Sequence, residues 1–298
     1  MRYFHVDVFA DKPLQGNGLA VVFPPEAGIE NSGLLAMAQE FKQFETIFLY
    51  PQAPGRARAR IFTVEEELAF AGHPVLGAAA VLHELHYPRE EQAELQIVLP
   101  ESEVVLRSTR LATSFRVEME LEKTHFGHSL SADEAKVVAA ALQLQPDDLH
   151  AAYPLEVASN GLPYLLVPVR QHLGEARIVA PDFAELLASW GAKFVYVFQP
   201  ETLEARTWDN QGLVEDVATG SAAGPLYSYL VRHGRCRKGE RITISQGRQV
   251  GRPSRIYGWV AEDDRVTVQG EVVFFAEGML AASVAERFAR SEAAGGKA

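Results

Sequence analysis

Glu45 is an acidic residue within a mostly apolar stretch of the sequence. Phe44 precedes it, and residues 46–50 (TIFLY) have the pattern of an apolar strand. Poor hydration penalises an ionised carboxylate and raises its pKa toward the range that is useful for proton transfer. The sequence therefore makes Glu45 a candidate general acid or base, although an edge-strand glutamate that faces water has the same local pattern.

Two glycines, Gly72 and Gly220, each stand at the start of an apolar segment with helical character. Glycine lets the backbone approach a ligand closely, and the first N–H groups of a helix have no partner within the helix. The helix dipole adds partial positive charge there, so two such termini would hold a carboxylate or stabilise an enolate as it forms. The alternative is that both glycines are turn residues and the helices only pack.

Side chains that donate or carry protons lie beside these glycines. His73 directly follows the first of them, and a helix N-terminus favours its neutral imidazole because a second positive charge is disfavoured there. Asp216, Thr219 and Ser221 flank the second. The alternative role of these three is to cap the helix, and the alternative for His73 is an ordinary surface or core residue.

The two glycine segments stand 148 residues apart, almost half of the 298-residue chain. A second similarity links residues 17–24 (NGLAVVFP) with residues 160–168 (NGLPYLLVP) at a similar offset. Two similarities in the same order predict the duplication of one αβ unit. We expect an N-terminal lobe over residues 1–125, completed by a C-terminal strand over residues 272–290, and a C-terminal lobe over residues 126–271.

Strands dominate the expected secondary structure. Short segments rich in β-branched or aromatic residues predict strands at residues 3–9, 19–23, 46–50, 57–62, 95–99, 115–121, 164–167, 193–198, 241–245, 257–261, 265–269 and 271–276. Helices are expected from about Ser32, after a capping box formed by Ser131 and Glu134, over residues 181–190, and after the two glycines. Residues 291–298 have the composition of a loose tail.

Composition excludes several classes of protein. The chain has 28 Lys and Arg against 39 Asp and Glu, and a net charge of −11 argues against a general nucleic-acid binder. The single cysteine, Cys236, excludes an intrachain disulfide, a thiolate-rich metal site and every mechanism that uses two thiols. His125 and His128 are better explained as surface residues than as metal ligands, because Gly127 interrupts a helix and no third ligand is near. We expect no metal.

Membrane and nucleotide partners are not expected either. Asp7 and Asp11 interrupt the region where a secretory leader would be apolar, and the most apolar window is too short to span a bilayer. The segment GNGLA lacks the G-x-G-x-x-G spacing of a dinucleotide-binding turn. We therefore expect a cytoplasmic protein without a nucleotide cofactor.

The chain resembles the phenazine-biosynthesis PhzF-like family, which has the diaminopimelate epimerase fold. The resemblance rests on ETIFL at residues 45–49, FAGHP at residues 70–74 and EDVATGSAAG at residues 215–224, and it covers nearly the whole chain. It implies an α+β fold of two pseudo-symmetric lobes, each a strongly bent mixed or antiparallel sheet wrapped round a central helix, with the active site between the lobes.

The resemblance also implies a function, namely a cofactor-independent isomerase that moves a proton between carbons of a small carboxylated substrate. The best-understood activity of the family isomerises trans-2,3-dihydro-3-hydroxyanthranilate. Carried onto this chain, the catalytic residues are Glu45, His73 and Asp216. The residues that contact the substrate are Gly72, Thr219, Gly220, Ser221 and Ala222. A homodimer is usual for such proteins and is expected here.

One residue departs from the family pattern. Phe44 stands where a small polar residue commonly precedes the catalytic glutamate, which affects how the Glu45 carboxylate is hydrogen-bonded. This departure keeps open an alternative function, a binding or sensing protein for small carboxylates that has lost the chemistry. The lone Cys236 separates the chain from relatives that place one thiol on each face of the α-carbon.

Overall fold

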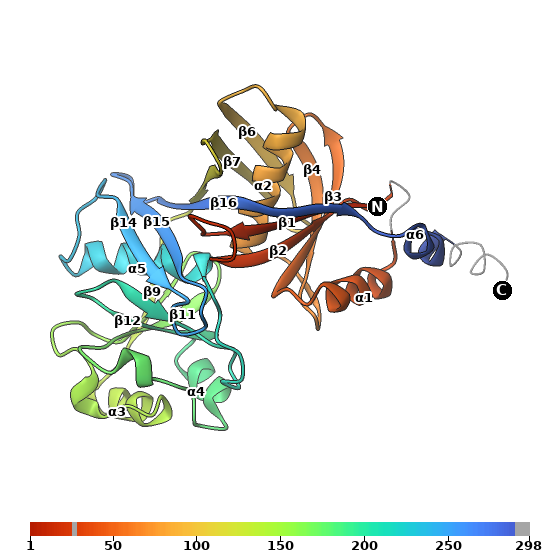
Figure 1. Cartoon of the computed structure of the whole chain (residues 1–298). Helices are drawn as coiled ribbons and strands as arrows, with labels where there is room; N and C mark the ends of the chain where they lie inside the picture. The colour runs from red at the N-terminus through yellow and green to blue at the C-terminus, as the bar shows by residue number, and fades with distance from the viewer. Residues whose placement is uncertain (26–28, 290–298) are drawn as a thin grey trace. The chain divides into compact units, whose positions relative to one another are not determined.

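The structure is a computed structural model that describes residues 1–25 and 29–289. It is a sheet-rich α+β fold whose chain divides into two compact units. Unit 1 contains residues 1–119 and residues from 270 onward, and unit 2 contains residues 120–269. The expected tail at residues 291–298 lies outside the described residues. Figure 1 shows the chain and labels most of its helices and strands.

Unit 1 is built on eight strands that close into a barrel, in the order β1, β2, β3, β4, β6, β7, β8, β16 and back to β1. The barrel strands are β1 (Arg2–Val8), β2 (Asn17–Val22), β3 (Glu45–Ala53), β4 (Arg56–Phe62), β6 (Gln92–Val98), β7 (Glu103–Arg110), β8 (Phe115–Leu121) and β16 (Val266–Met279), and β5 (Glu67–Leu68) stands outside this order. β2 pairs with β3 and β4 pairs with β6 in parallel, whereas β1 with β2, β3 with β4, β6 with β7, β7 with β8 and β16 with β1 are antiparallel. The short β5 pairs with β4.

Helix α2 (Gly72–His86) packs against β1, β2, β3, β6 and β7 of this barrel. Every residue from Gly72 to His83 is buried, as expected of a helix that is apolar on all sides. Gly77 allows α2 to pack closely against β2, because a Cβ atom at this position would lie 2.4 Å from the Leu19 side chain. The other helices of the unit are α1 (Asn31–Phe41) and α6 (Ala282–Ala289).

A second apolar cluster of unit 1 lies beneath α1. Leu34, Met37 and Ala38 of this helix pack with Phe48 and other side chains from β2, β3 and β4. Leu280, which follows β16, and Val284 and Phe288 of α6 also pack against the cluster. The helix expected from about Ser32 is thus confirmed, with its apolar face on the sheet.

Unit 2 arranges its strands in the order β16, β15, β14, β13, β12, β11, β10, β9. Its strands are β9 (His125–Ser129), β10 (Glu156–Ser159), β11 (Pro163–Pro168), β12 (Phe194–Gln199), β13 (Glu204–Arg206), β14 (Ile242–Gln246) and β15 (Ser254–Val260). Helix α5 (Gly220–Arg232) packs against β10, β11 and β15. The remaining helical elements are α3 (Ala132–Ala141), η1 (Pro146–Asp148), η2 (Leu173–Glu175) and α4 (Phe183–Ser189).

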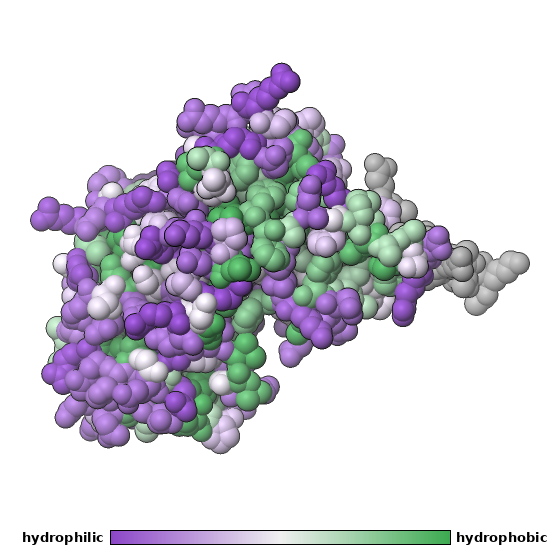
Figure 2. Space-filling view, viewed as in Figure 1, coloured by the Kyte–Doolittle hydropathy of each residue, from purple (hydrophilic) through white to green (hydrophobic). Residues whose placement is uncertain are grey.

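In unit 2 the structure confirms the elements whose local sequence signals are strong. The Ser131 hydroxyl accepts a hydrogen bond from the Glu134 backbone, and the Glu134 carboxylate accepts one from the Ser131 backbone, so the predicted capping box starts α3. Gly191, with a φ of 79°, follows α4 as expected. Hydrophilic side chains cover the visible surface around α3 (Figure 2).

The C-terminal segment corrects the sequence analysis. The two strands expected at residues 265–269 and 271–276 are one strand, β16, and it ends at Met279 rather than continuing to residue 290. Gly270 does not break it, because the missing side chain leaves room for the Phe9 ring, 2.6 Å from where a Cβ atom would lie. Residues 282–289 then form α6 instead of extending the strand.

The sheet also limits what can be substituted behind α5. A Cβ atom at Gly258 would lie 2.2 Å from the Tyr227 ring and 2.3 Å from the Thr267 carbonyl oxygen. We expect Gly258→Ala to lower the free energy of unfolding by about 3 kcal/mol, because a buried ring and a backbone atom must both move. Gly174→Ala is the control, because only the Gln249 amide, at 3.9 Å, lies near. Urea denaturation of both variants checks this, and equal stabilities would contradict it.

Within the part of the chain that the structure describes, no helix combines the length and the hydropathy needed to cross a membrane.

Candidate active site

Glu45 and His73 meet in unit 1, although 28 positions separate them in the chain. Glu45 is the first residue of β3 and lies opposite Leu19 of the parallel strand β2. His73 is the second residue of α2, whose first turn contains no acidic side chain. The strand start and the helix start therefore bring the two titratable groups together.

The Glu45 Oε2 and His73 Nε2 atoms lie 3.3 Å apart. The histidine side chain is 7% exposed and the glutamate side chain is 17% exposed, and the two atoms that face each other are both buried. Two lone pairs would repel each other at this distance, so a proton between the atoms favours the contact. The pair is therefore placed to share and pass on one proton.

Burial lowers the pKa of His73 from 6.5 to about 3. The imidazole is thus neutral at physiological pH, as expected from the sequence. The cause differs, because the sequence pattern points to the helix terminus, whereas in the structure the cause is desolvation by burial. A neutral imidazole both donates and accepts a hydrogen bond, which is what a relay for a neighbouring carboxyl group requires.

The depressed pKa of His73 predicts an effect on stability. Between pH 6.5 and 3 the unfolded chain binds a proton at this residue and the folded chain does not, so stability falls as the pH falls. His73 alone should contribute a slope of about 1.4 kcal/mol per pH unit within that window. We expect His73→Asn to lose this slope between pH 6.5 and 5 in urea denaturation. The exposed His125, changed to Asn, should keep it, and an unchanged slope in His73→Asn would contradict the assignment.

In unit 2, Asp216 and Thr219 meet just before α5. The Thr219 hydroxyl donates a short hydrogen bond to Asp216 Oδ2, and the Ala218 backbone donates to Asp216 Oδ1 at 3.4 Å. The Asp216 backbone N–H is held by the Thr207 carbonyl at 3.0 Å. Thr219 precedes the first residue of the helix but its side chain does not cap it. The carboxylate is thus oriented by the turn that leads into the helix.

The first turn of α5 contains the other predicted residues. Gly220 and Ala222 are buried, and Ser221 is half-buried. The Ser221 hydroxyl lies 2.7 Å from the Tyr164 hydroxyl of β11. Tyr164 was not singled out in the sequence, where it reads as one aromatic residue of a strand. It gives Ser221 a fixed hydrogen-bond partner.

A buried ion pair anchors the residue that precedes Asp216. Arg206 and Glu215 form two hydrogen bonds, Nε to Oε1 at 2.9 Å and Nη2 to Oε2 at 2.6 Å. Their side chains are 7% and 9% exposed. Arg206 Nη1 also donates to the Leu173 and Ala176 carbonyls at 2.8 and 2.9 Å. Sequence analysis missed this pair, because the two residues stand in unremarkable polar surroundings.

The structure also places the other residues that the sequence analysis considered. Cys236 is buried after α5, and burial raises the pKa of its thiol, which opposes a nucleophilic role. His125 and His128 are both exposed on β9. Among the described residues, no group of three or more His, Cys, Asp or Glu could hold a metal ion. Phe44 is also exposed.

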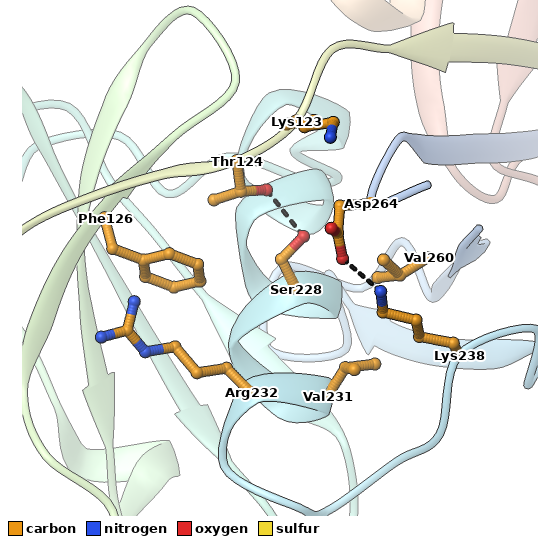
Figure 3. A pocket seen from close by; sticks show the side chains of 9 residues that line it. All are labelled: Lys123, Thr124, Phe126, Ser228, Val231, Arg232, Lys238, Val260 and Asp264. Carbon is orange, nitrogen blue, oxygen red and sulfur yellow. Dashed lines mark hydrogen bonds and ion pairs between the residues drawn. The ribbon is translucent and has the colours of Figure 1, made fainter. Parts of the chain in front are cut away.

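A pocket of about 310 Å³ in unit 2 is distinct from the predicted residues (Figure 3). It is lined by Lys123, Thr124, Phe126, Ser228, Val231, Arg232, Lys238, Val260 and Asp264. Its polar groups already contact one another, since Thr124 bonds to Ser228 at 2.7 Å and Lys238 pairs with Asp264 at 2.5 Å. The carboxylate of Asp264 and the hydroxyls of Thr124 and Ser228 are therefore already engaged by neighbours within the pocket.

Comparison with solved structures supports the fold. A predicted epimerase from Pseudomonas aeruginosa matches with a TM-score of 0.88 and 46% identity, covering 94% of this chain and 98% of that one. A protein of the phenazine biosynthesis PhzF family from Bacillus anthracis matches with a TM-score of 0.80 and 20% identity, over 94% of this chain and 99% of that one. The second likeness concerns the fold alone.

Sequence comparison adds the family. The trans-2,3-dihydro-3-hydroxyanthranilate isomerase of Pseudomonas aeruginosa is 34% identical over 93% of this chain and 98% of its own length. The family model described as phenazine biosynthesis-like protein (PhzC-PhzF) matches residues 6–278. The chain therefore belongs to the phenazine biosynthesis-like PhzC-PhzF family and is an isomerase of that family.

Proposed function

We propose that the protein is a cofactor-independent isomerase that moves a proton between two carbon atoms of a small carboxylated substrate. The observation that carries this proposal is the 3.3 Å contact between the Glu45 carboxylate and the buried His73 imidazole. A half-buried carboxylate with a neutral histidine beside it suits proton abstraction from carbon, because the base keeps little water of its own. Glu45 is the general base in this proposal.

The proposed reaction has two steps. Glu45 takes a proton from one carbon, and the electron pair of the broken C–H bond spreads over the adjacent unsaturated system as an enolate-like anion. The same proton, or one relayed through His73 or Asp216, then forms a C–H bond at a second carbon. Nothing is oxidised or reduced overall. General acid–base catalysis contributes about 10²–10⁴-fold, so stabilisation of the anion must supply much of the remainder.

The proposed binding groups are the residues at the two helix starts. The backbone N–H groups at Gly72 and Gly220 carry the positive ends of the helix dipoles of α2 and α5, which suits a carboxylate or an enolate oxygen. Thr219, Ser221 and Ala222 would contribute further contacts. The hydroxyl of Ser221 already has Tyr164 as a partner, which would hold it in place for a ligand.

The relatives support a proposal for the substrate class. A relative 34% identical to this chain is named trans-2,3-dihydro-3-hydroxyanthranilate isomerase. We propose a substrate of the same chemistry, a cyclic carboxylate that bears amino or hydroxyl groups. The remaining proposals are that the two units are pseudo-symmetric lobes with α2 and α5 as their central helices, and that the protein is a cytoplasmic homodimer.

The duplication has support from connectivity. In unit 1 the parallel strands β2 and β3 are joined through α1, and in unit 2 the parallel strands β11 and β12 are joined through α4. The strands β2 and β11 carry most of the similar stretches NGLAVVFP and NGLPYLLVP. The same order of strand, helix and parallel strand is what two copies of one αβ unit would give.

A screen for solvent exchange tests the proposed function. Cyclic amino and hydroxy carboxylates, beginning with trans-2,3-dihydro-3-hydroxyanthranilate, are incubated with the protein in D₂O and followed by NMR. The proposal expects deuterium at one carbon of at least one compound, at a rate that scales with protein concentration. Tight binding of such compounds without any exchange would contradict it and favour a binding or sensing protein.

A further inference from the structure

Gln246, the last residue of β14, is a buried amide with all of its hydrogen-bonding capacity in use. It is 2% exposed. Its Oε1 accepts from the Tyr196 hydroxyl at 2.9 Å and from the Thr219 backbone N–H at 3.1 Å. Its Nε2 donates to the Asp216 carbonyl at 3.0 Å and to Thr219 Oγ1 at 2.9 Å. A side-chain amide has two donors and two lone pairs, so none remains.

The partners fix which way the amide points. A backbone N–H can only donate, so the atom facing the Thr219 N–H is the oxygen of Gln246. A backbone carbonyl can only accept, so the atom facing the Asp216 carbonyl is the nitrogen. Tyr196 reinforces this orientation, because burial raises the pKa of its hydroxyl well above the ordinary value and keeps it a donor.

The bonds form a chain with one direction. Tyr196 donates to Gln246, Gln246 donates to the Thr219 hydroxyl, and that hydroxyl has one proton, which it donates to Asp216 Oδ2. Each donor in the chain is turned toward Asp216. The Asp216 carboxylate therefore receives a hydrogen bond from Thr219. The geometry of that bond is set by Gln246 and Tyr196 in the interior of unit 2.

We propose that Gln246 is a positioning residue that acts through Thr219 to hold the Asp216 carboxylate in its working orientation. This inference rests on the proposed function, in which Asp216 contacts the substrate. Gln246 itself touches neither substrate nor reacting atoms. Its role differs from that of an ordinary buried amide in the core. One of its four bonds goes to the Asp216 backbone carbonyl, and another goes to the Thr219 hydroxyl that donates to the Asp216 carboxylate.

The expected effect is on turnover rather than on binding. Gln246→Leu keeps the volume and removes all four bonds, and a catalytic group displaced by about 1 Å loses about 10²-fold in rate. With trans-2,3-dihydro-3-hydroxyanthranilate as the probe, we expect kcat to fall about 10- to 100-fold while KM stays within about threefold. Gln249→Leu is the matched control, because Gln249 is exposed and its amide donates to Glu204 rather than to the turn before α5.

A double-mutant cycle separates positioning from a general loss of structure. Asp216→Asn is expected to lower kcat about 100-fold. If Gln246 acts through Asp216, then Gln246→Leu in the Asp216→Asn background should lower kcat by less than about twofold further. The same fold-loss in both backgrounds would overturn the inference and leave the role of Asp216 intact. An Asp216→Asn variant with unchanged kcat would instead overturn the proposed catalytic role of Asp216.

One readout needs no turnover. In ¹⁵N-labelled protein, the side-chain amide protons of Gln246 should exchange with D₂O at least about 10³-fold more slowly than those of Gln249, because each is hydrogen-bonded and buried. Thr219→Val should lose much of this protection, since the variant removes the acceptor for one of the two protons. Equal exchange rates for the two glutamines would overturn the proposed network.

Discussion

Glu45→Gln is expected to lower kcat by about 10³-fold or more. The substitution keeps the size of the side chain and its place at the start of β3, but an amide cannot take a proton from carbon. The contact with His73 at 3.3 Å can be kept, because an amide can either donate to the imidazole or accept from it, so the fold should be retained. Steady-state kinetics with trans-2,3-dihydro-3-hydroxyanthranilate measures kcat of the natural protein and of the variant.

Glu45→Asp is the matched variant for this prediction. It retains the carboxylate but withdraws it by one methylene, which should cost about 10- to 100-fold in kcat. If kcat falls in Glu45→Asp and falls further in Glu45→Gln, then Glu45 acts as a base and its distance from the substrate affects the rate. Thermal unfolding of both variants should change by only a few degrees, because the side chain is partly exposed. A glutamine variant with kcat within threefold of the natural protein would contradict the proposed role.

Arg206→Met is expected to lower the free energy of unfolding by about 3–5 kcal/mol. The substitution leaves the Glu215 carboxylate, which is 9% exposed, without the guanidinium that holds it with two hydrogen bonds. It also leaves the Leu173 and Ala176 carbonyls without their shared donor. Urea denaturation of the full chain measures the change.

An exposed arginine in the same unit provides the control. Arg265 pairs with Glu120 and Asp263, and its side chain is 45% exposed. Arg265→Met should lower the free energy of unfolding by no more than about 1 kcal/mol, because surface pairs are weak. Changing Arg206 and Glu215 together to methionine should recover part of the loss, since no buried charge then lacks a partner. Similar losses for Arg206→Met and Arg265→Met would contradict this account.

The sequence predicted those elements whose signals are local. Strands such as β8, where apolar and polar residues alternate, and the capped helix α3 were found close to their observed bounds. Strands with mixed composition were missed, among them β7 (Glu103–Arg110), which alternates only weakly. Gly270 has the sequence pattern of a strand break, because a sequence does not show that Phe9 fills the space beside it.

For the candidate site too, some residues can be predicted from local sequence and others only from the packing of distant segments. Glycine at a helix start and a glutamate before an apolar strand can be recognised from neighbouring residues alone. The contact between Glu45 and His73 depends on how β3 and α2 pack, which local pattern does not reveal. Gln246 stands in the ordinary string TISQG, and its role appears only when β14 brings it to the turn before α5. Buried networks between distant segments are what sequence reasoning could not supply.

The most direct test of the account is the transfer of solvent deuterium to carbon, compared between the natural protein and Glu45→Gln. Each is incubated in D₂O with trans-2,3-dihydro-3-hydroxyanthranilate, and the carbon positions of substrate and product are followed by NMR and mass spectrometry. We expect the natural protein to place one deuterium at the carbon that receives the proton, and the variant to place almost none. Incorporation by Glu45→Gln at the natural rate would show that another group is the base and would contradict the central claim.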